Sequence, residues 1–264
     1  MATRTRRSQR RTEALSRERI IEAAVELLDA TGEGGLTFRA LTERLATGAG
    51  AIYWHVANKG ELLAAATDAV VAAALAVEPA QPPGSPREEI RAVALGLFDA
   101  IEEHPWLATQ LAIQLSRSPW GSVTPRIFES LGRPVRALGV PEDRWFTAGS
   151  VLVHYVLGAA GQNAANAASV RDLAPGVDRA EFLDTASKAW EELDPDDYPF
   201  TRALAGRLRD HDDREQFLGG VDLVLAGITA DPGRVSPKSL PAAFGQAPGS
   251  DSSATQAVNG RAST

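Results

Sequence analysis

Apolar residues recur at helical spacing along most of the chain. Near the N-terminus they return every three or four residues, as at Ile20, Ala24 and Leu27, which is the pattern of a helix with one buried face. The same pattern predicts helices over residues 16–30, 37–45, 49–56, 58–77, 85–104, 106–116, 124–138, 141–168, 178–193, 200–209 and 213–228. No segment alternates convincingly as a strand does, so the sequence predicts an all-α fold.

Composition shifts divide these helices into domains. Residues 1–15 hold many charges and few apolar residues, and Pro, Ser, Gly and Ala dominate residues 231–264, so a disordered basic arm and a disordered tail are expected. The Pro-rich stretch at 78–86 predicts a linker. We therefore expect one domain at 16–60 and a second at 61–230, which starts with a connecting helix at 61–77.

The segment 37–59 predicts two short helices separated by a tight turn. Thr37 is a good N-cap for the first, and Gly48 is expected to supply the positive φ that ends it. In the second, Ile52 and Val56 would face inward, which leaves two aromatic residues and a histidine on or beside the outer face. A short helix, a turn and a second short helix form a helix-turn-helix, whose second helix enters the DNA major groove.

The residues of this segment resemble one family in particular. IYWHV, followed by Asn58-Lys59, is similar to the recognition segment L-Y-W-H-V-x-N-K of the tetracycline-repressor (TetR) family, and Thr37-x-Arg39 resembles the family's T-x-R opening of the preceding helix. The alternative is a core helix with an aromatic stripe, but three consecutive residues cannot all face one core. The resemblance implies DNA contacts from Thr37, Arg39, Ala49, Gly50, Ala51, Tyr53, Trp54, His55 and Lys59.

These residues are expected to bind DNA in different ways. The aromatic edges and Lys59 would mainly hold phosphate and sugar, whereas Arg39 suits either a phosphate or a guanine edge. Gly48-Ala49-Gly50-Ala51 replaces the polar and proline residues of the founding repressor, and such small side chains cannot donate side-chain hydrogen bonds to bases. The segment therefore predicts DNA binding and leaves the operator sequence open.

Charge and composition agree with a DNA-binding protein. The whole chain has a net charge of −7, yet residues 1–60 carry ten Arg and Lys against seven Asp and Glu, so one end attracts phosphates. A merely solvated arm is the alternative. The chain has no cysteine, which excludes disulfides and thiol-bound metal. It also shows no apolar run of membrane-spanning length and no secretory signal pattern, so no membrane partner and a cytoplasmic location are expected.

The C-terminal half carries a looser resemblance to the same family. DREQFLGGVDLVLAGI and Val153–Gly158 are similar to helices of the tetracycline-repressor-like ligand domain, so the resemblance covers roughly residues 16–229. It implies a homodimer built as a four-helix bundle from the helices at 141–168 and 213–228, with two DNA-binding domains spaced to read a palindrome. Packing of these smooth, glycine-containing helices within one chain is the alternative.

A small-molecule site is expected in this second domain. The candidate lining residues are aromatic or amide side chains on helices, which suits a mostly apolar pocket with a few polar anchors. They are Trp106, Gln110, Gln114, Trp120, Phe128, His154, Tyr155 and Gln162, and ordinary core packing is the alternative for each. Gln162 matches a carboxylate that helps bind a magnesium–drug chelate in the founding repressor, and an amide is a poor Mg²⁺ ligand, so no metal and no cofactor are expected.

Enzyme motifs are absent from the sequence. There is no glycine-rich phosphate loop, no H-E-x-x-H, no G-x-S-x-G and no cysteine nucleophile, and the acidic cluster Asp194-Pro195-Asp196-Asp197 reads as a solvated helix end. The sequence therefore predicts a dimeric DNA-binding transcriptional regulator, a repressor that a small molecule releases from a palindromic operator. The alternative function is a helical small-molecule-binding or enzymatic domain with a vestigial DNA-binding head.

Overall fold

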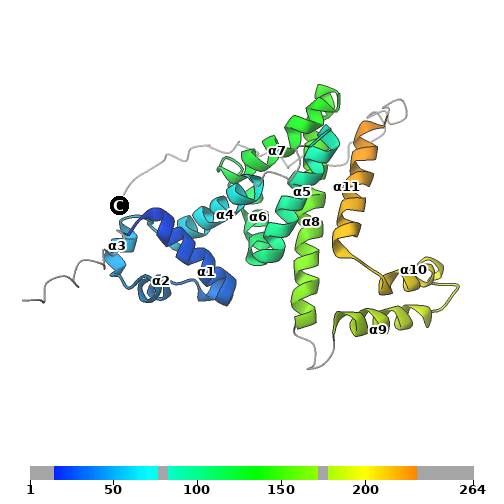
Figure 1. The fold of residues 1–264 in the computed structure, drawn as a ribbon, viewed down its shortest axis with the longest axis horizontal. Helices are drawn as coiled ribbons and strands as arrows, with labels where there is room; N and C mark the ends of the chain where they lie inside the picture. The colour runs from blue at the N-terminus through cyan, green and yellow to red at the C-terminus, as the bar shows by residue number, and fades with distance from the viewer. Residues whose placement is uncertain (1–14, 77–82, 172–177, 231–264) are drawn as a thin grey trace, which may run out of the picture. The chain divides into compact units, whose positions relative to one another are not determined.

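The computed structural model describes residues 15–76, 83–171 and 178–230, and every regular element among them is helical (Figure 1). The α-helices are α1 Arg17–Gly35, α2 Phe38–Leu45, α3 Ala49–Tyr53, α4 Lys59–Ala76, α5 Pro86–Glu103, α6 Trp106–Arg117, α7 Val123–Ala137, α8 Trp145–Arg171, α9 Arg179–Glu191, α10 Pro199–Arg209 and α11 Asp213–Thr229, with a 3₁₀ turn at Glu142–Arg144 before α8. The predicted all-α fold is confirmed. The predicted arm (apart from Leu15), most of the linker and the tail lie outside the described residues.

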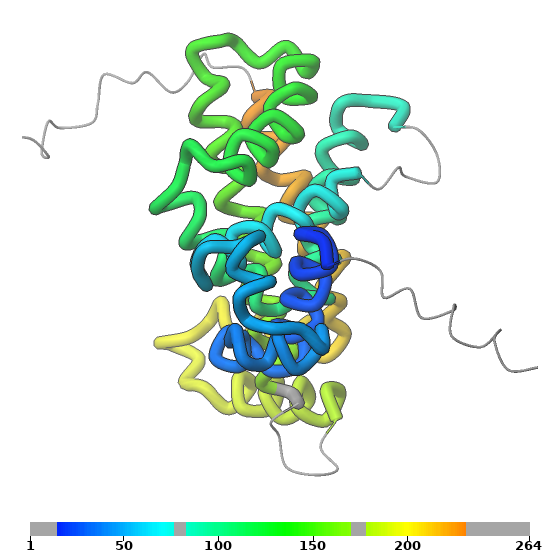
Figure 2. The backbone as a smooth tube through the Cα atoms, turned by 90° about the vertical axis from the view of Figure 1, so that its left-hand side faces the viewer, coloured from blue at the N-terminus to red at the C-terminus, as the bar shows by residue number. Residues whose placement is uncertain are grey.

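Helices α1, α2 and α3 form a small head (residues 16–58) around one apolar cluster. Ile20 and Leu28 of α1, Leu41 of α2, and Ile52 with Val56 are all buried in it. α1 also packs along α4, which continues the chain toward the remaining helices (Figure 2). The head is therefore built from the apolar positions that its helical pattern predicts.

Helices α5, α6, α7, α8 and α11 form a larger bundle, called the body here (residues 86–171 and 213–229). α5 lies at its centre and packs against α4, α7, α8 and α11. A Cβ added to Gly96 of α5 would lie 2.8 Å from the Ala74 carbonyl oxygen, so α4 and α5 meet there backbone to backbone. This close approach ties α4 to the middle of the body.

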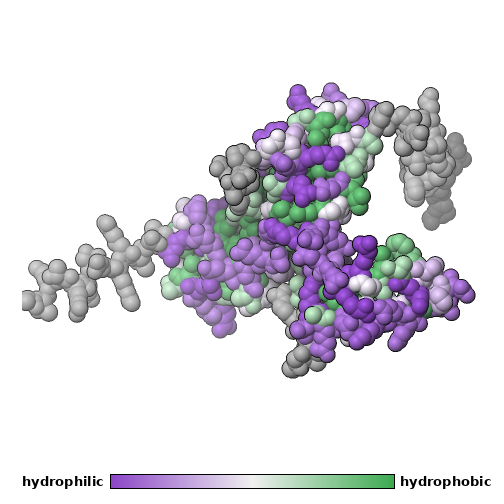
Figure 3. All heavy atoms as spheres, turned by 45° about the vertical axis from the view of Figure 1, so that its right-hand side comes forward, coloured by the Kyte–Doolittle hydropathy of each residue, from purple (hydrophilic) through white to green (hydrophobic). Residues whose placement is uncertain are grey.

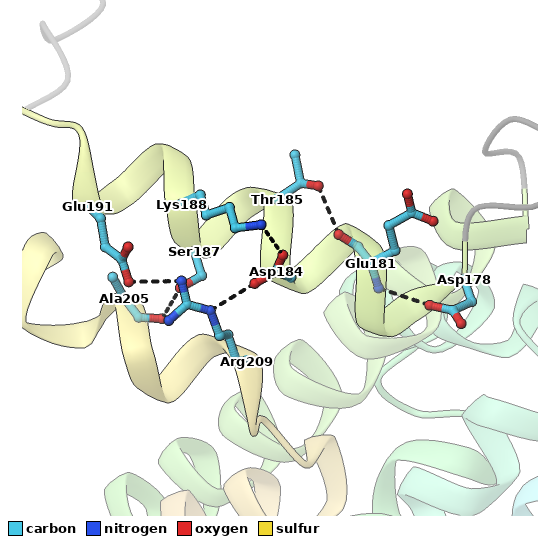
Figure 4. Close-up of polar contacts among 9 residues, drawn as sticks. All are labelled: Asp178, Glu181, Asp184, Thr185, Ser187, Lys188, Glu191, Ala205 and Arg209. Atoms are coloured by element: carbon cyan, nitrogen blue, oxygen red, sulfur yellow. Dashed lines mark hydrogen bonds and ion pairs between the residues drawn. The ribbon is translucent and has the colours of Figure 1, made fainter.

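Helices α9 and α10 pack against each other as a hairpin and share several polar contacts (Figure 4). Asp184 accepts from Lys188 and from Arg209, whose guanidinium also pairs with Glu191. The hydroxyl of the buried Ser187 donates to the Ala205 carbonyl across 2.6 Å. The two cations lower the pKa of Asp184 by hydrogen bonding, so the carboxylate that joins both helices stays ionised.

Two local expectations for the head are wrong. The residue with positive φ is Ala46, at 48°, whereas Gly48 is extended at φ −86° and ψ 150°. The turn starts at Ala46, where the predicted helix 37–45 ends, but its left-handed residue is this alanine and not the glycine. In addition, α3 ends at Tyr53 and not at Val56. The His55 and Val56 N–H groups both donate to the Ile52 carbonyl, which tightens the last turn and still buries Val56.

Candidate DNA-binding and effector sites

Side-chain and backbone caps fix the geometry of the helix-turn-helix. The Thr37 hydroxyl accepts from the Ala40 N–H at 3.1 Å and so caps α2, as predicted. At the other end, the Thr47 N–H donates to the Thr42 carbonyl at 3.1 Å, a bond that the left-handed residue between them makes possible. α3 then starts from the extended Gly48, and its first residues lie on the surface.

The predicted recognition residues form an exposed face. Tyr53 is 52% exposed and stacks on Phe38 with ring centroids 4.4 Å apart, which fixes the direction of the phenol. Trp54 is 87% exposed, an unusual exposure for so large an apolar side chain. Thr37, Ala49, Gly50 and Ala51 are exposed as well, and nothing lies within 4 Å of a Cβ built on Gly50. This end of α3 can therefore approach another backbone closely.

Arg39 lies on the surface of α2 beside this face. Its Nε donates to Glu43 at 2.9 Å, and this hydrogen bond raises the pKa of the guanidinium. The two side chains are 88% and 65% exposed, and an ion pair so open to water is weak. Arg39 thus remains charged and can exchange Glu43 for a phosphate or a base at little cost.

His55 and Lys59 lie deeper than the other predicted DNA contacts. Both are partly buried, and Lys59 Nζ donates to the Glu33 carbonyl near the end of α1 at 2.5 Å. A cation at that place stabilises the negative end of the helix. Lys59 therefore has a structural partner in the head, and no local sequence pattern predicts this contact across 26 residues.

Two predicted pocket residues instead join the body to the head. Trp106 Nε1 donates to Asp29 Oδ1 at 2.7 Å, and Gln110 Nε2 donates to Glu33 Oε1 at 2.8 Å. His104 Nδ1 lies 2.8 Å from the same Asp29 oxygen. The two acceptors belong to α1, and the indole and amide donors belong to α6. These contacts therefore form a joint between head and body.

The other predicted pocket residues are spread over the body. Gln114 and Trp120 line a cavity of about 380 Å³ beside α1 and α4, and Phe128 lines one of about 330 Å³ between α7 and α8. His154 is exposed on α8. Tyr155 and Gln162 lie together in a cavity of about 620 Å³ between α5, α8 and α11. The structure therefore does not bring the eight predicted residues into one site.

The cavity beside Tyr155 and Gln162 has an aromatic wall and an amide rim. Phe98 and Phe217 lie with ring centroids 4.6 Å apart, and Tyr155 donates from its hydroxyl to the Phe217 carbonyl at 3.0 Å. Burial raises the pKa of the Tyr155 phenol. Asn163, which is 8% exposed, lines the same cavity, and its Oδ1 atom has no hydrogen-bond partner among the described residues. Asn163 is not among the eight residues that the sequence predicts for a pocket.

The described residues include no cluster of the usual metal-ligating side chains. They contain no group of three or more His, Cys, Asp or Glu side chains arranged to hold one. Within the same part of the chain, no helix is both long and apolar enough to cross a membrane.

Two family models match the chain and together cover both halves of it. Residues 20–66 match the model described as "Bacterial regulatory proteins, tetR family". Residues 78–231 match "Tetracyclin repressor-like, C-terminal domain", which alone spans more than half of the chain. The first model contains the helix-turn-helix, and the second contains α5–α11.

Similar proteins agree with these matches. An HTH-type transcriptional regulator of Saccharopolyspora erythraea is 33% identical over 144 residues, which is 54% of this chain and 59% of that relative, so the match spans little more than half of it. The solved structure of SCO7222, a TetR from Streptomyces coelicolor, is 69% identical with a TM-score of 0.73 and covers 82% of this chain and 98% of that one.

A second solved structure is of a protein with its ligand. The Streptomyces coelicolor TetR family protein ActR in complex with actinorhodin is 26% identical with a TM-score of 0.66, covering 83% of this chain and 97% of that one. The motif of the head, both family models and these likenesses agree. The chain belongs to the TetR family of DNA-binding transcriptional regulators, which are not enzymes.

Proposed function

We propose that two copies of this chain form a repressor that binds a palindromic operator and leaves it when a small molecule binds the body. The observation that carries the proposal is the exposed face of α3, where Tyr53 and Trp54 flank small residues that allow close approach. Aromatic side chains as exposed as these are typical of a surface that binds another molecule, because only a partner can remove them from water. The position of α3 after the turn makes the DNA major groove that partner.

The residues of the head would divide the work of binding. Tyr53, Trp54 and His55 hold phosphate and sugar: the first two rings are exposed at the end of α3, and the partly buried His55 lies next to them in the chain. Arg39 lies one helix earlier, where its guanidinium reaches a phosphate or a guanine edge after leaving Glu43. Ala49, Gly50 and Ala51 let the helix backbone approach the bases.

The exposed faces of α8 and α11 support a dimer. Leu223 of α11 is 76% exposed and Val151 of α8 is 43% exposed, and hydrophobic surface is visible on the side of the molecule where α11 lies (Figure 3). Nothing lies within 4 Å of a Cβ built on Gly158 or Gly219, so both glycines are open to a second helix pair. Two such faces related by a twofold axis make a four-helix interface and place two heads on one duplex.

The joint between α1 and α6 would carry the response to the ligand. Asp29 and Glu33 of the head are bonded to Trp106 and Gln110 of the body, so a shift of α6 changes the position of α1. A ligand that favours one arrangement of α6 shifts the protein between its DNA-binding and non-binding states. It lowers DNA affinity only as far as its own affinity differs between these two states. ActR, in complex with actinorhodin, is a relative with a small-molecule ligand. The effector here is a small organic molecule, and Gln162 argues against a magnesium–tetracycline chelate.

Selection from random double-stranded DNA with the full chain tests the proposal. We expect an inverted repeat to be enriched, since two identical heads read two identical half-sites. Sedimentation of the free protein should give twice the mass of one chain. Replacing Tyr53 and Trp54 by Ala should abolish the retention of the selected duplex in a gel shift, and it should leave the dimer intact because both side chains are exposed.

A matched control replaces two exposed aromatic residues of the α9–α10 hairpin, Phe182 and Phe200, by Ala. This variant should still retain the duplex. If no sequence is enriched, or if the Tyr53 and Trp54 variant binds DNA as the parent does, the chain does not bind operator DNA as proposed. A small-molecule-binding protein with a vestigial head would then be the better account.

A further inference from the structure

A groove between head and body contains none of the residues discussed as an effector site. It has a volume of about 550 Å³ and lies where α1, α4 and α5 meet. Its floor is aliphatic and is made by Ile21, Val25, Ala69, Val70, Ala73 and Ala100. Small side chains leave the space open, while the backbone contact between Gly96 and Ala74 prevents α4 and α5 from closing it.

Four carboxylates rim this apolar floor. Glu22 and Glu26 stand on the α1 side, and Asp99 and Glu103 stand on the α5 side. Glu26 pairs with Arg44, and Asp99 pairs with Arg214, so two of the four charges are compensated by cations outside the groove. The residues that line the groove include no Lys or Arg, and His104, its one imidazole, faces Asp29.

The remaining two carboxylates have no cation partner among the described residues. Glu22 and Glu103 are exposed, and the described part of the chain gives neither side chain an ion pair or a hydrogen bond. They stand on opposite walls of the groove, one on α1 and one on α5. The groove therefore combines an aliphatic floor with an uncompensated negative rim. Such a surface favours a ligand that carries apolar groups and a positive charge. The apolar groups are removed from water on the floor, and the charge is attracted by two carboxylates.

We propose that this groove binds a small lipophilic cation, an organic ammonium or phosphonium ion. The apolar groups of the ligand rest on the alanine-rich floor between α4 and α5, and the charge of the ligand faces Glu22 and Glu103. The ligand touches α1 of the head and α5 of the body at once, at a place separate from the cavity beside Tyr155 and Gln162. The proposal does not depend on the operator or on the effector proposed above.

Two ions of nearly the same shape and opposite charge test the proposal. Tetraphenylphosphonium and tetraphenylborate each carry four phenyl groups around one central atom, so they differ mainly in the sign of the charge. In isothermal titration calorimetry of the full chain without DNA, at low salt, we expect the phosphonium ion to bind and the borate ion not to bind. The affinity for the phosphonium ion should fall as salt screens the carboxylates.

Substitutions locate the site. Glu22→Gln with Glu103→Gln should weaken phosphonium binding about tenfold, since each exposed charge contributes modestly. The matched control, Glu142→Gln with Glu192→Gln, changes the net charge equally at exposed positions outside the groove and should leave binding unchanged. Ala73→Trp fills the groove from an exposed position of α4 and should abolish binding while the thermal transition of the protein persists.

The outcomes separate the site from general attraction. Equal binding of the two ions would show that shape alone, and not the negative rim, attracts the ligand. Equal weakening by the two double variants would show attraction to the net charge of the protein. Binding that survives Ala73→Trp would place the ligand elsewhere. Any of the three results overturns the proposal, and none depends on whether the chain binds an operator.

Discussion

The indole Nε1 of Trp106 donates a hydrogen bond to Oδ1 of Asp29 across 2.7 Å, and this bond joins the first turn of α6 to α1 of the head. Trp106 is 9% exposed, so the indole N–H is removed from water and needs this acceptor. The same oxygen lies 2.8 Å from His104 Nδ1. One carboxylate of the head therefore receives two side chains of the body, which makes Asp29 the centre of the joint.

Trp106→Phe tests how strongly this bond holds the joint. The substitution keeps one aromatic ring but removes the donor and part of the buried indole volume, so we expect the free energy of unfolding in urea to fall by about 1 to 3 kcal/mol. Asp29→Asn weakens the same bond from the other side. If the two residues interact directly, the double variant should lose clearly less than the sum of the two single losses.

The matched control for this cycle is Trp190→Phe, on a partly exposed tryptophan of α9 whose indole has no hydrogen-bond partner among the described residues. It should change stability by much less than Trp106→Phe does. Additive losses from Trp106→Phe and Asp29→Asn would mean that the indole and the carboxylate contribute independently, contrary to the geometry.

The joint also shows where sequence reasoning stops. Helical spacing was enough to predict the burial of Ile52 and Val56, because that burial depends on neighbours within one helix pair. The bond from Trp106 to Asp29 spans 77 residues, and no local pattern relates its two ends. Trp106 and Gln110 were expected in a pocket for sound reasons, since aromatic and amide side chains on an inner face suit one. Only the packing of α6 on α1 gives them another partner.

The turn of the head gives a similar contrast. Glycine was expected to carry the positive φ because alanine pays a steric cost there, yet the chain places Ala46 in that conformation and leaves Gly48 extended. The cost is local, and the bond from Thr47 to Thr42 together with the burial of Leu41 holds the turn in place. Packing overrides the preference of about 1 kcal/mol for glycine over alanine at positive φ. Rules based on local sequence do not include such packing.

Ala46→Gly should therefore stabilise the protein. Glycine takes a φ near +48° without the clash of Cβ against the carbonyl, and we expect a gain of up to about 1 kcal/mol in the free energy of unfolding. Ala40→Gly is the control, because Ala40 lies inside α2 with helical geometry, and there the same change should cost about 1 kcal/mol. Thermal or urea unfolding of the two variants should give shifts of opposite sign. Destabilisation by both would contradict the strain at Ala46.

Arg39→Ala should weaken DNA binding and report which group the side chain contacts. If Arg39 holds a phosphate, affinity should fall about equally on all duplexes, and the slope of log affinity against log salt should decrease by about 1. If it reads a guanine, the loss should be confined to sequences with that base. Glu43→Ala is the control, since it removes the partner of Arg39 in the free protein and should not weaken binding. An Arg39→Ala variant with unchanged affinity on the selected operator would exclude both contacts.

Gly220→Ala should disturb the packing of α11 on α8. A Cβ at this position would lie 1.8 Å from Tyr155 Oη, so the phenol must move and lose its bond to the Phe217 carbonyl. We expect a loss of about 1 to 3 kcal/mol in the free energy of unfolding. Gly206→Ala is the control, in α10 and outside the proposed dimer interface, where nothing lies within 4 Å of the new Cβ. It should leave stability unchanged or raise it slightly, because alanine favours the helix. Similar losses from the two substitutions would show that Tyr155 does not fill the space beside Gly220.

The ionisation of Tyr155 should make stability depend on alkaline pH. Burial disfavours the phenolate, so the pKa of Tyr155 is raised above its ordinary value near 10. The neutral phenol donates to the Phe217 carbonyl at 3.0 Å, a bond that the phenolate cannot make. Because the folded pKa is the higher one, the contribution of this group is fully present below about pH 10 and is lost as the pH rises through the folded value.

The tyrosinate absorbance of the parent and of Tyr155→Phe gives the measurement. The chain has three tyrosines, so the difference between the two titrations isolates this phenol. We expect that difference to appear at a higher pH than for a free tyrosine. In urea unfolding above about pH 10, the parent should lose stability more steeply with pH than Tyr155→Phe does. A difference titration at the ordinary pKa, with parallel stability curves, would mean that water reaches the phenol and that α11 does not cover it. Such a result would also remove the physical basis for the expected effect of Gly220→Ala, since both depend on the same contact.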